Sequence, residues 1–210
     1  MKVMLVNGSP HEKGCTYTAL EQVADALNTE GIETEIFHIG TKPLSGCIAC
    51  RKCVELGHCV FSDKVNDFVD IAGSADGFVF GSPVHYASAG GAITSFMDRV
   101  FFSDMGSGKR TFYLKPAAAV VSARRAGTTA TFDQLNKYFT ISQMPVISSS
   151  YWNMVHGAVP DEVQKDLEGL LVMRTLGRNM AWFLKCKEAG IKAGIAFPEM
   201  EERVFTNFIR

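Results

Sequence analysis

Short apolar runs alternate with longer amphipathic stretches along almost the whole chain, and this alternation constrains the fold more than any other feature. The pattern is typical of βαβ units, in which crossover helices join parallel strands. Apolar runs predict five strands, at residues 2–7, 33–39, 77–81, 117–122 and 145–149. Amphipathic periodicity predicts five helices, at residues 16–30, 62–72, 92–102, 129–139 and 161–189. The sequence therefore predicts an α/β protein with a doubly wound, five-stranded parallel sheet in the order 2-1-3-4-5 and helices on both faces.

Composition places the chain among ordinary globular proteins. Of its 210 residues, 47% are hydrophobic and 20% are charged, which is enough apolar surface for one sizeable core. The formal net charge is −1, whereas proteins that bind nucleic acids or membrane surfaces concentrate positive charge, so neither partner is expected. The N-terminal apolar run at residues 3–6 is too short for a secretion signal or a membrane span, so we expect a cytoplasmic protein.

The chain divides into one domain and a tail. Residues 1–189 contain all the predicted strands and helices and form the expected domain, with a cysteine-bearing loop at residues 42–61. Residues 103–110 are rich in Gly and Ser and predict a flexible connection. Residues 190–210 lack clear periodicity but end in several large apolar side chains. Because such a tail gains by leaving water, we expect it to bury against something, with another subunit as one option.

The loop after the first strand leads directly into a helix and reads Asn-Gly-Ser-Pro-His-Glu-Lys-Gly-Cys-Thr. Such a turn directs backbone N–H groups and a helix N-terminus at one point, which creates an anion site. It is neither a Gly-x-Gly-x-x-Gly loop nor a Walker A loop, so a tight dinucleotide site is disfavoured. The alternative is that its glycines and proline only shape a turn. The residues predicted to hold a phosphate are Ser9, His11, Lys13, Gly14, Cys15, Thr16 and Thr18.

The loops after the third and fourth strands should lie beside this anion site, because ligands of doubly wound sheets bind beyond the carboxyl ends of the strands. Val84 and Tyr86 offer flat apolar surface for a planar ring, and Gly90 permits close backbone approach. His85 and Tyr86 could equally be plain surface residues, and Arg124 with Arg125 could be solvated charge. The candidate residues after the third strand are Pro83, Val84, His85, Tyr86, Ala87, Ser88 and Gly90; those after the fourth are Ser122, Arg124, Arg125 and Gly127.

Four of the six cysteines fall within thirteen residues, at Cys47, Cys50, Cys53 and Cys59. The C-x2-C-x2-C spacing lets three thiolates converge on one iron–sulfur cluster, and Cys59 can supply the fourth ligand. Structural zinc more often uses two C-x2-C pairs separated by a longer span, and a disulfide is disfavoured in a reducing compartment. A [4Fe-4S] cluster, free thiols and zinc all remain open readings of this segment.

In their order along the chain, these motifs resemble those of the NADPH-dependent FMN reductases within the flavodoxin-like superfamily. The resemblance includes the Gly-Ser-Pro…Gly-x-Thr loop, the Ser-Pro-Val segment after the third strand and Phe96-Met97-Asp98-Arg99. His11 stands where Arg is common in the family, and Cys15 where Asn is common. The cysteine spacing is similar to that of the iron–sulfur flavoproteins. The resemblance implies FMN with its phosphate on the first loop, a [4Fe-4S] cluster on the four cysteines, and a homodimer or homotetramer.

The hypothesis that follows is an FMN-dependent oxidoreductase that passes electrons between a donor and a small acceptor such as a quinone or O₂. The donor is a ferredoxin-like protein or NAD(P)H, and no catalytic side chain is assigned because the cofactors perform the chemistry. One alternative is an NAD(P)H-dependent FMN or quinone reductase without a cluster, with a transient nicotinamide site above the flavin. Another is a zinc-stabilised module that binds some other anion.

Overall fold

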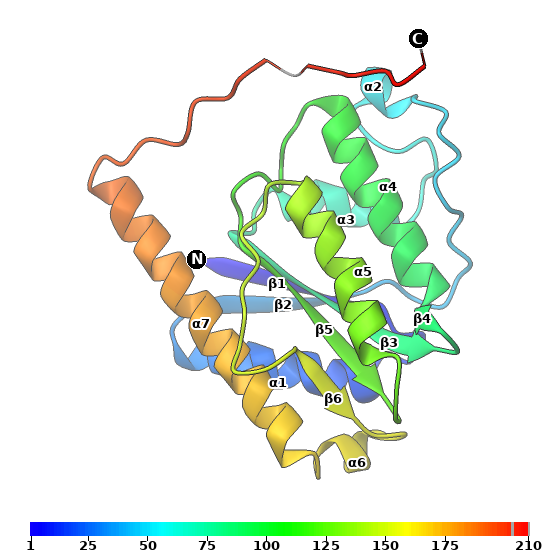
Figure 1. Ribbon diagram of the computed structural model, residues 1–210, viewed down its shortest axis with the longest axis vertical. Helices are drawn as coiled ribbons and strands as arrows, with labels where there is room; N and C mark the ends of the chain where they lie inside the picture. Colours follow the sequence, from blue (N-terminus) through cyan, green and yellow to red (C-terminus); the bar gives the residue numbers. More distant parts are fainter. Residues whose placement is uncertain (203, 210) are drawn as a thin grey trace.

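The computed structural model describes residues 1–202 and 204–209 and contains one central sheet (Figure 1). Its strands pair in parallel in the order β2-β1-β3-β5-β6, which is the predicted 2-1-3-4-5 order of a flavodoxin-like sheet. A short strand, β4 (Ser88–Ala89), folds back antiparallel on the end of β3. The parallel strands are β1 (Lys2–Asn7), β2 (Glu33–His38), β3 (Gly77–His85), β5 (Ala117–Ala123) and β6 (Met154–His156).

Helices cover both faces of the sheet, as the sequence predicts (Figure 1). On one face, alternate side chains of β1 and β3 such as Leu5 and Val79 pack with α1 and α7. On the other face, Met4 and Phe80 pack with α3, α4 and α5. Because helices cover both faces of the sheet, the central strands are buried on both sides and do not alternate between apolar and polar residues. The helices are α1 (Cys15–Thr29), α2 (Cys53–Leu56), α3 (Lys64–Ala72), α4 (Gly91–Ser107), α5 (Thr128–Ile141), α6 (Pro160–Val163) and α7 (Leu167–Lys192).

The fifth parallel strand differs in position from the sequence prediction of residues 145–149. Val146 forms only an isolated bridge to Ala117, and regular pairing with β5 resumes at β6. Between the two, the Ser149 hydroxyl contacts the Asn153 side chain at 2.7 Å and donates to the Tyr151 carbonyl at 2.6 Å. Serine and asparagine side chains that bond locally compete with a sheet ladder, so the chain bulges away before it rejoins β5.

Three further boundaries differ from the sequence expectation. The helix α4 continues to Ser107, so the first half of the segment expected to be flexible is helical. The long helix predicted at 161–189 is two helices, because α6 ends at Val163 and the Asp166 side chain caps a new helix by accepting the Gly169 N–H at 2.9 Å. The helix α7 then runs three residues into the segment predicted as tail.

The tail does not bury its apolar side chains against its own domain. Val204, Phe205, Phe208 and Ile209 are 85–94% exposed. Burial of the tail against another subunit stays a prediction. Among the described residues, no helix is both long and apolar enough to cross a membrane.

The contact between α1 and α7 provides a test of the packing. A Cβ placed on Gly177 would lie 2.7 Å from the Ala26 Cβ and 2.8 Å from the Val23 carbonyl oxygen. We expect Gly177→Ala to lower the free energy of unfolding, because overpacking of about 1–3 kcal/mol exceeds the gain in helix propensity of about 1 kcal/mol. Gly73→Ala is the matched control, since its added Cβ meets nothing within 4 Å and its φ of −58° is helical. Equal urea unfolding curves for the two variants would contradict this packing.

Candidate functional site

Three loops meet at the carboxyl edge of the sheet, where β1 and β3 send the chain to opposite faces. The Gly8 N–H donates to the Gly81 carbonyl at 2.9 Å, which joins the first loop to β3. The hydroxyls of Thr16 and Ser122 lie 2.8 Å apart and join the start of α1 to the end of β5. The three loops that the sequence assigns to one ligand are therefore adjacent in the structure.

The loop between β1 and α1 is shaped by a side chain that the sequence analysis missed. Asn7 is fully buried at the end of β1. Its amide donates to the carbonyls of Glu12 at 2.9 Å and His11 at 3.4 Å, and its side-chain oxygen accepts the Ser9 N–H at 3.1 Å. One sequence signal could have indicated this role. Asn7 is a polar residue at the end of an otherwise apolar strand, just before a Gly-Ser-Pro turn.

His38 supports the same loop from the end of β2. Its Nε2 lies 2.8 Å from the Ser9 carbonyl oxygen. Because a carbonyl only accepts, Nε2 carries the hydrogen in this contact. The two residues are 29 positions apart in sequence, so local pattern gave no sign of this bond. Together with Asn7, His38 fixes the backbone of the loop from two neighbouring strands.

The start of α1 carries the backbone donors of the predicted anion site. Gly14 is its N-cap residue and makes no side-chain capping bond, so the cap residue itself does not occupy the N–H groups of the first turn. The Ser9 hydroxyl oxygen accepts the His11 N–H at 3.1 Å, which leaves the Ser9 proton available to a ligand. The Thr18 hydroxyl instead donates to the Gly14 carbonyl at 3.3 Å, and Thr16 is paired with Ser122. Backbone N–H groups and Ser9 are therefore the donors best placed for a phosphate.

The segment after β3 is a hairpin rather than the open loop expected for residues 82–91. The strand continues to His85, and the chain turns at Tyr86 and Ala87 into β4. Tyr86 adopts a φ of 58°, rare for a non-glycine residue, and its side chain is fully exposed. Strained residues of this kind concentrate at ligand sites.

The loop after β5 approaches this hairpin closely. Gly127 has a φ of +89°, and a Cβ there would lie 2.8 Å from the Val84 Cγ1. Glycine is therefore required both by the backbone conformation and by the contact. Arg124 and Arg125 precede it and are exposed. The structure thus brings the predicted ring-binding residues of both loops together, while their contacts with a ligand stay a prediction.

The cysteine segment folds beside α4 on the face of the sheet covered by α3, α4 and α5. The four candidate cysteines line one small pocket together with Arg99 and Phe102. Cys53 begins α2, and a Cβ on Gly106 of α4 would lie 2.9 Å from its Sγ, so the two helices touch at this point. Burial, followed by the neighbouring cysteines, raises the pKa of the Cys53 thiol.

Arg99 anchors this segment. The side chain is buried, and its guanidinium forms two hydrogen bonds with the Asp63 carboxylate, at 2.7 and 2.9 Å. Its Nε donates to the Cys59 Sγ at 3.2 Å. In the sequence Arg99 stands out only as part of a motif, and this role leaves no local pattern because its partners lie 36 and 40 positions away.

The pocket does not have the geometry of a mononuclear metal centre. Across residues 1–202 and 204–209, no group of three or more His, Cys, Asp or Glu side chains is placed to hold a single metal ion. A four-iron cluster makes a different demand, because each thiolate binds its own iron. The assignment of Cys47, Cys50, Cys53 and Cys59 as ligands stays a prediction.

The sheet order and the uncapped loop at the β1/β3 switch point define a flavodoxin-like protein. Comparison with known proteins gives the family: the chain belongs to the NADPH-dependent FMN reductases, whose family model matches residues 1–159. It is 32% identical over 190 residues to an iron-sulfur flavoprotein of Methanocaldococcus jannaschii, covering 88% of this chain and 98% of that protein. An iron-sulfur flavoprotein of Archaeoglobus fulgidus is 24% identical over 194 residues, with 87% and 97% covered.

Solved structures agree on the fold. A crystal structure of RosB with a bound formylriboflavin phosphate intermediate superposes with a TM-score of 0.70 at 14% identity, covering 100% of this chain and 94% of that one. A WrbA-like flavodoxin of Agrobacterium tumefaciens gives 0.61 at 15% identity, covering 88% and 96%. Family and fold together identify the chain as an FMN-dependent oxidoreductase.

The role of Asn7 can be tested with Asn7→Asp. An aspartate cannot donate to the two carbonyls, and it adds negative charge beside the phosphate site. We expect FMN to bind at least about tenfold more weakly in a fluorescence titration of apoprotein. Asn28→Asp makes the same change at the far end of α1, where the side chain is exposed, and should leave the affinity unchanged. Equal affinities for the two variants would exclude Asn7 as the organiser of the loop.

Proposed function

We propose that the protein transfers electrons through FMN at the carboxyl edge of the sheet and through a [4Fe-4S] cluster on Cys47, Cys50, Cys53 and Cys59. The observation that supports the cluster is the shared pocket: all four cysteines line it, with no carboxylate among its lining residues. An all-thiolate donor set suits iron–sulfur chemistry. The names of the archaeal relatives point the same way.

In this proposal the chain supplies binding and electrostatics. FMN, when bound, supplies the chemistry of accepting two electrons and releasing them singly. Asn7 and His38 hold the first loop so that its N–H groups and Ser9 face the phosphate. The hairpin at Tyr86 offers a surface for the ring system. The side chains of Arg124 and Arg125 place positive charge where it favours a reduced, anionic flavin.

Arg99 has a second role beside the cysteines. A hydrogen bond to a ligating sulfur and a nearby positive charge both stabilise the more negative, reduced form of a cluster. The Nε contact with the Cys59 Sγ provides both from one side chain. Because the same guanidinium also pairs with Asp63, the cation is held in place rather than free to turn to solvent.

The donor is proposed to be a ferredoxin-like protein or NAD(P)H, and the acceptor a small molecule such as a quinone or O₂. A cluster-free NAD(P)H-dependent FMN or quinone reductase is the second candidate, favoured by the family description. Rapid bleaching of the flavin by NADPH in iron-free protein would support it. Membership of an FMN reductase family leaves the zinc-stabilised anion-binding module without support.

We further propose a homodimer or homotetramer, in which the apolar tail meets another subunit.

Cysteine substitution tests the cluster. In anaerobically purified and reconstituted protein, we expect Cys50→Ser to lose most iron and acid-labile sulfide while FMN binding is retained, because the pocket is separate from the phosphate loop. Cys186→Ser is the matched control, since Cys186 is an exposed cysteine on α7. Iron and sulfide near zero in the unmodified protein would reject the cluster and leave the second candidate.

Substitution of Arg99 tests its proposed effect on potential. Arg99→Lys keeps the charge but loses the bidentate contact and the Nε–Sγ bond. We expect a more negative midpoint potential of the cluster in a dithionite titration followed by electron paramagnetic resonance, with FMN affinity unchanged. We also expect a loss of stability of about 3 kcal/mol in urea unfolding, because a buried ion pair is disturbed. An unchanged potential in a variant that retains iron would remove Arg99 from this role.

A further inference from the structure

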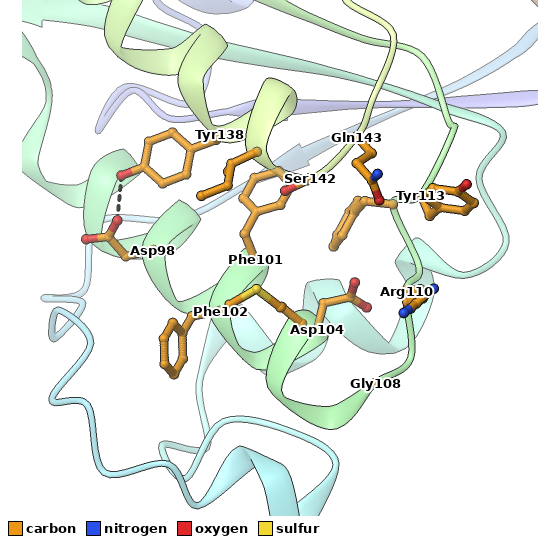
Figure 2. A pocket seen from close by; sticks show the side chains of 13 residues that line it. Asp98, Phe101, Phe102, Asp104, Gly108, Arg110, Tyr113, Tyr138, Ser142 and Gln143 are labelled. Atoms are coloured by element: carbon orange, nitrogen blue, oxygen red, sulfur yellow. Dashed lines mark hydrogen bonds between the residues drawn. The ribbon is translucent and has the colours of Figure 1, made fainter. Parts of the chain in front are cut away.

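A cavity of about 320 Å³ lies between the second half of α4, the end of α5 and residues 110–113 (Figure 2). It is distant from the flavin loops, because α4 and α5 both begin at the carboxyl edge of the sheet and the cavity lies at their other ends. A volume of this size is within the range of small-molecule sites. Nothing in the proposed flavin chemistry uses it.

Aromatic side chains form its walls. The ring centroids of Phe101 and Phe112 are 4.8 Å apart, and those of Phe101 and Tyr138 are 5.8 Å apart. Phe102 and Tyr113 also line the cavity, and Figure 2 shows the rings of Phe101 and Tyr138 beside one another. Flat, rigid surfaces of this kind pack best against another planar ring. The shape therefore selects a planar aromatic ligand over a branched aliphatic one.

Polar groups stand at separate points of the lining. The Tyr138 hydroxyl donates to Asp98 at 2.5 Å, and burial together with this bond raises the pKa of Tyr138, so the phenol stays neutral. Asp104 is only 5% exposed, and one of its oxygens accepts the Thr111 N–H at 3.0 Å. Arg110 also lines the cavity, and its guanidinium contacts the Met200 sulfur rather than a carboxylate. Two carboxylates against one guanidinium disfavour an anionic ligand and favour a neutral one that donates from a hydroxyl.

We propose that this cavity binds a neutral planar aromatic molecule carrying a hydroxyl group, with its ring packed against the cluster of Phe101, Phe112 and Tyr138 and its hydroxyl toward a carboxylate. The side chain of Phe102 lines both this cavity and the cysteine pocket. A ligand bound here is therefore separated from the pocket of the four cysteines by the Phe102 side chain. This position suits a small redox partner, and only that suggestion about the ligand's role rests on the proposed function.

Binding is tested with 2-naphthol, a two-ring phenol that takes no part in redox exchange. Its fluorescence is titrated with FMN-loaded protein whose iron content has been measured. We expect saturable binding of 2-naphthol and, because of the two carboxylates, at least about tenfold weaker binding of 2-naphthoate. Ile141→Trp fills the mouth of the cavity from a side chain that is 76% exposed, and it should weaken 2-naphthol binding at least about tenfold.

Leu171→Trp on α7 is the matched control, because it adds the same indole to a half-exposed position on the opposite face of the sheet and should leave binding unchanged. No binding of 2-naphthol, or equal loss in both variants, would overturn the proposal whatever the iron content. Binding of 2-naphthol only after deletion of residues 196–210 would also overturn the proposal, because it would assign the cavity to the tail. A change of oligomeric state in Ile141→Trp without 2-naphthol binding would overturn it too, because it would assign the cavity to a second copy of the chain. Binding in iron-free protein supports the site and rejects only the cluster.

Discussion

The divergence of the chain after β1 and β3 is the constraint on which the rest of the structure depends. These strands are neighbours in a parallel sheet, yet α1 follows β1 onto one face and α4 follows β3 onto the other. Right-handed crossovers on opposite faces leave an opening between the two chains at their carboxyl ends. The Gly8–Gly81 hydrogen bond closes the floor of that opening. The N-terminus of α1 and the β3 hairpin both follow at this edge, and the bonds of Asn7 and His38 then fix the loop that leads into α1.

The cysteine segment depends on a different kind of interaction. Between β2 and α3 the chain contains few large buried side chains, so hydrophobic burial alone stabilises a single conformation of this segment only weakly. A buried guanidinium replaces that burial, because Arg99 contacts Asp63, Cys59 and two backbone carbonyls at once. A desolvated charge is tolerable only when its partners are in place, so the segment and the cation order each other. This explains how a loop in which two of the four cysteines are exposed can still present all four to one pocket.

Periodicity predicted the elements that hydrophobic burial specifies, namely the first four parallel strands and the helices between them. It failed where side-chain hydrogen bonds decide the path, as at Ser149 and Asn153 before β6 and at Asp166 before α7. In the candidate site, motif reading located the correct loops but not the residues that shape them. Asn7, His38 and Arg99 act by reaching backbone or sulfur atoms, two of them at distant positions, and contacts of that kind leave no local pattern.

The helix α4 illustrates how one segment meets several demands at once. Ile93, Phe96 and Val100 face the sheet at helical spacing. The stripe of Arg99, Ser103 and Gly106 faces the cysteine segment, and the stripe of Asp98, Phe101, Phe102 and Met105 faces the aromatic cavity. Because three faces of α4 are in contact with the core, the cysteine segment or the cavity, little of its surface is exposed to solvent. This explains why phenylalanine and methionine occur on several of its faces. Any change that rotates α4 would therefore disturb the core, the cysteine pocket and the cavity together.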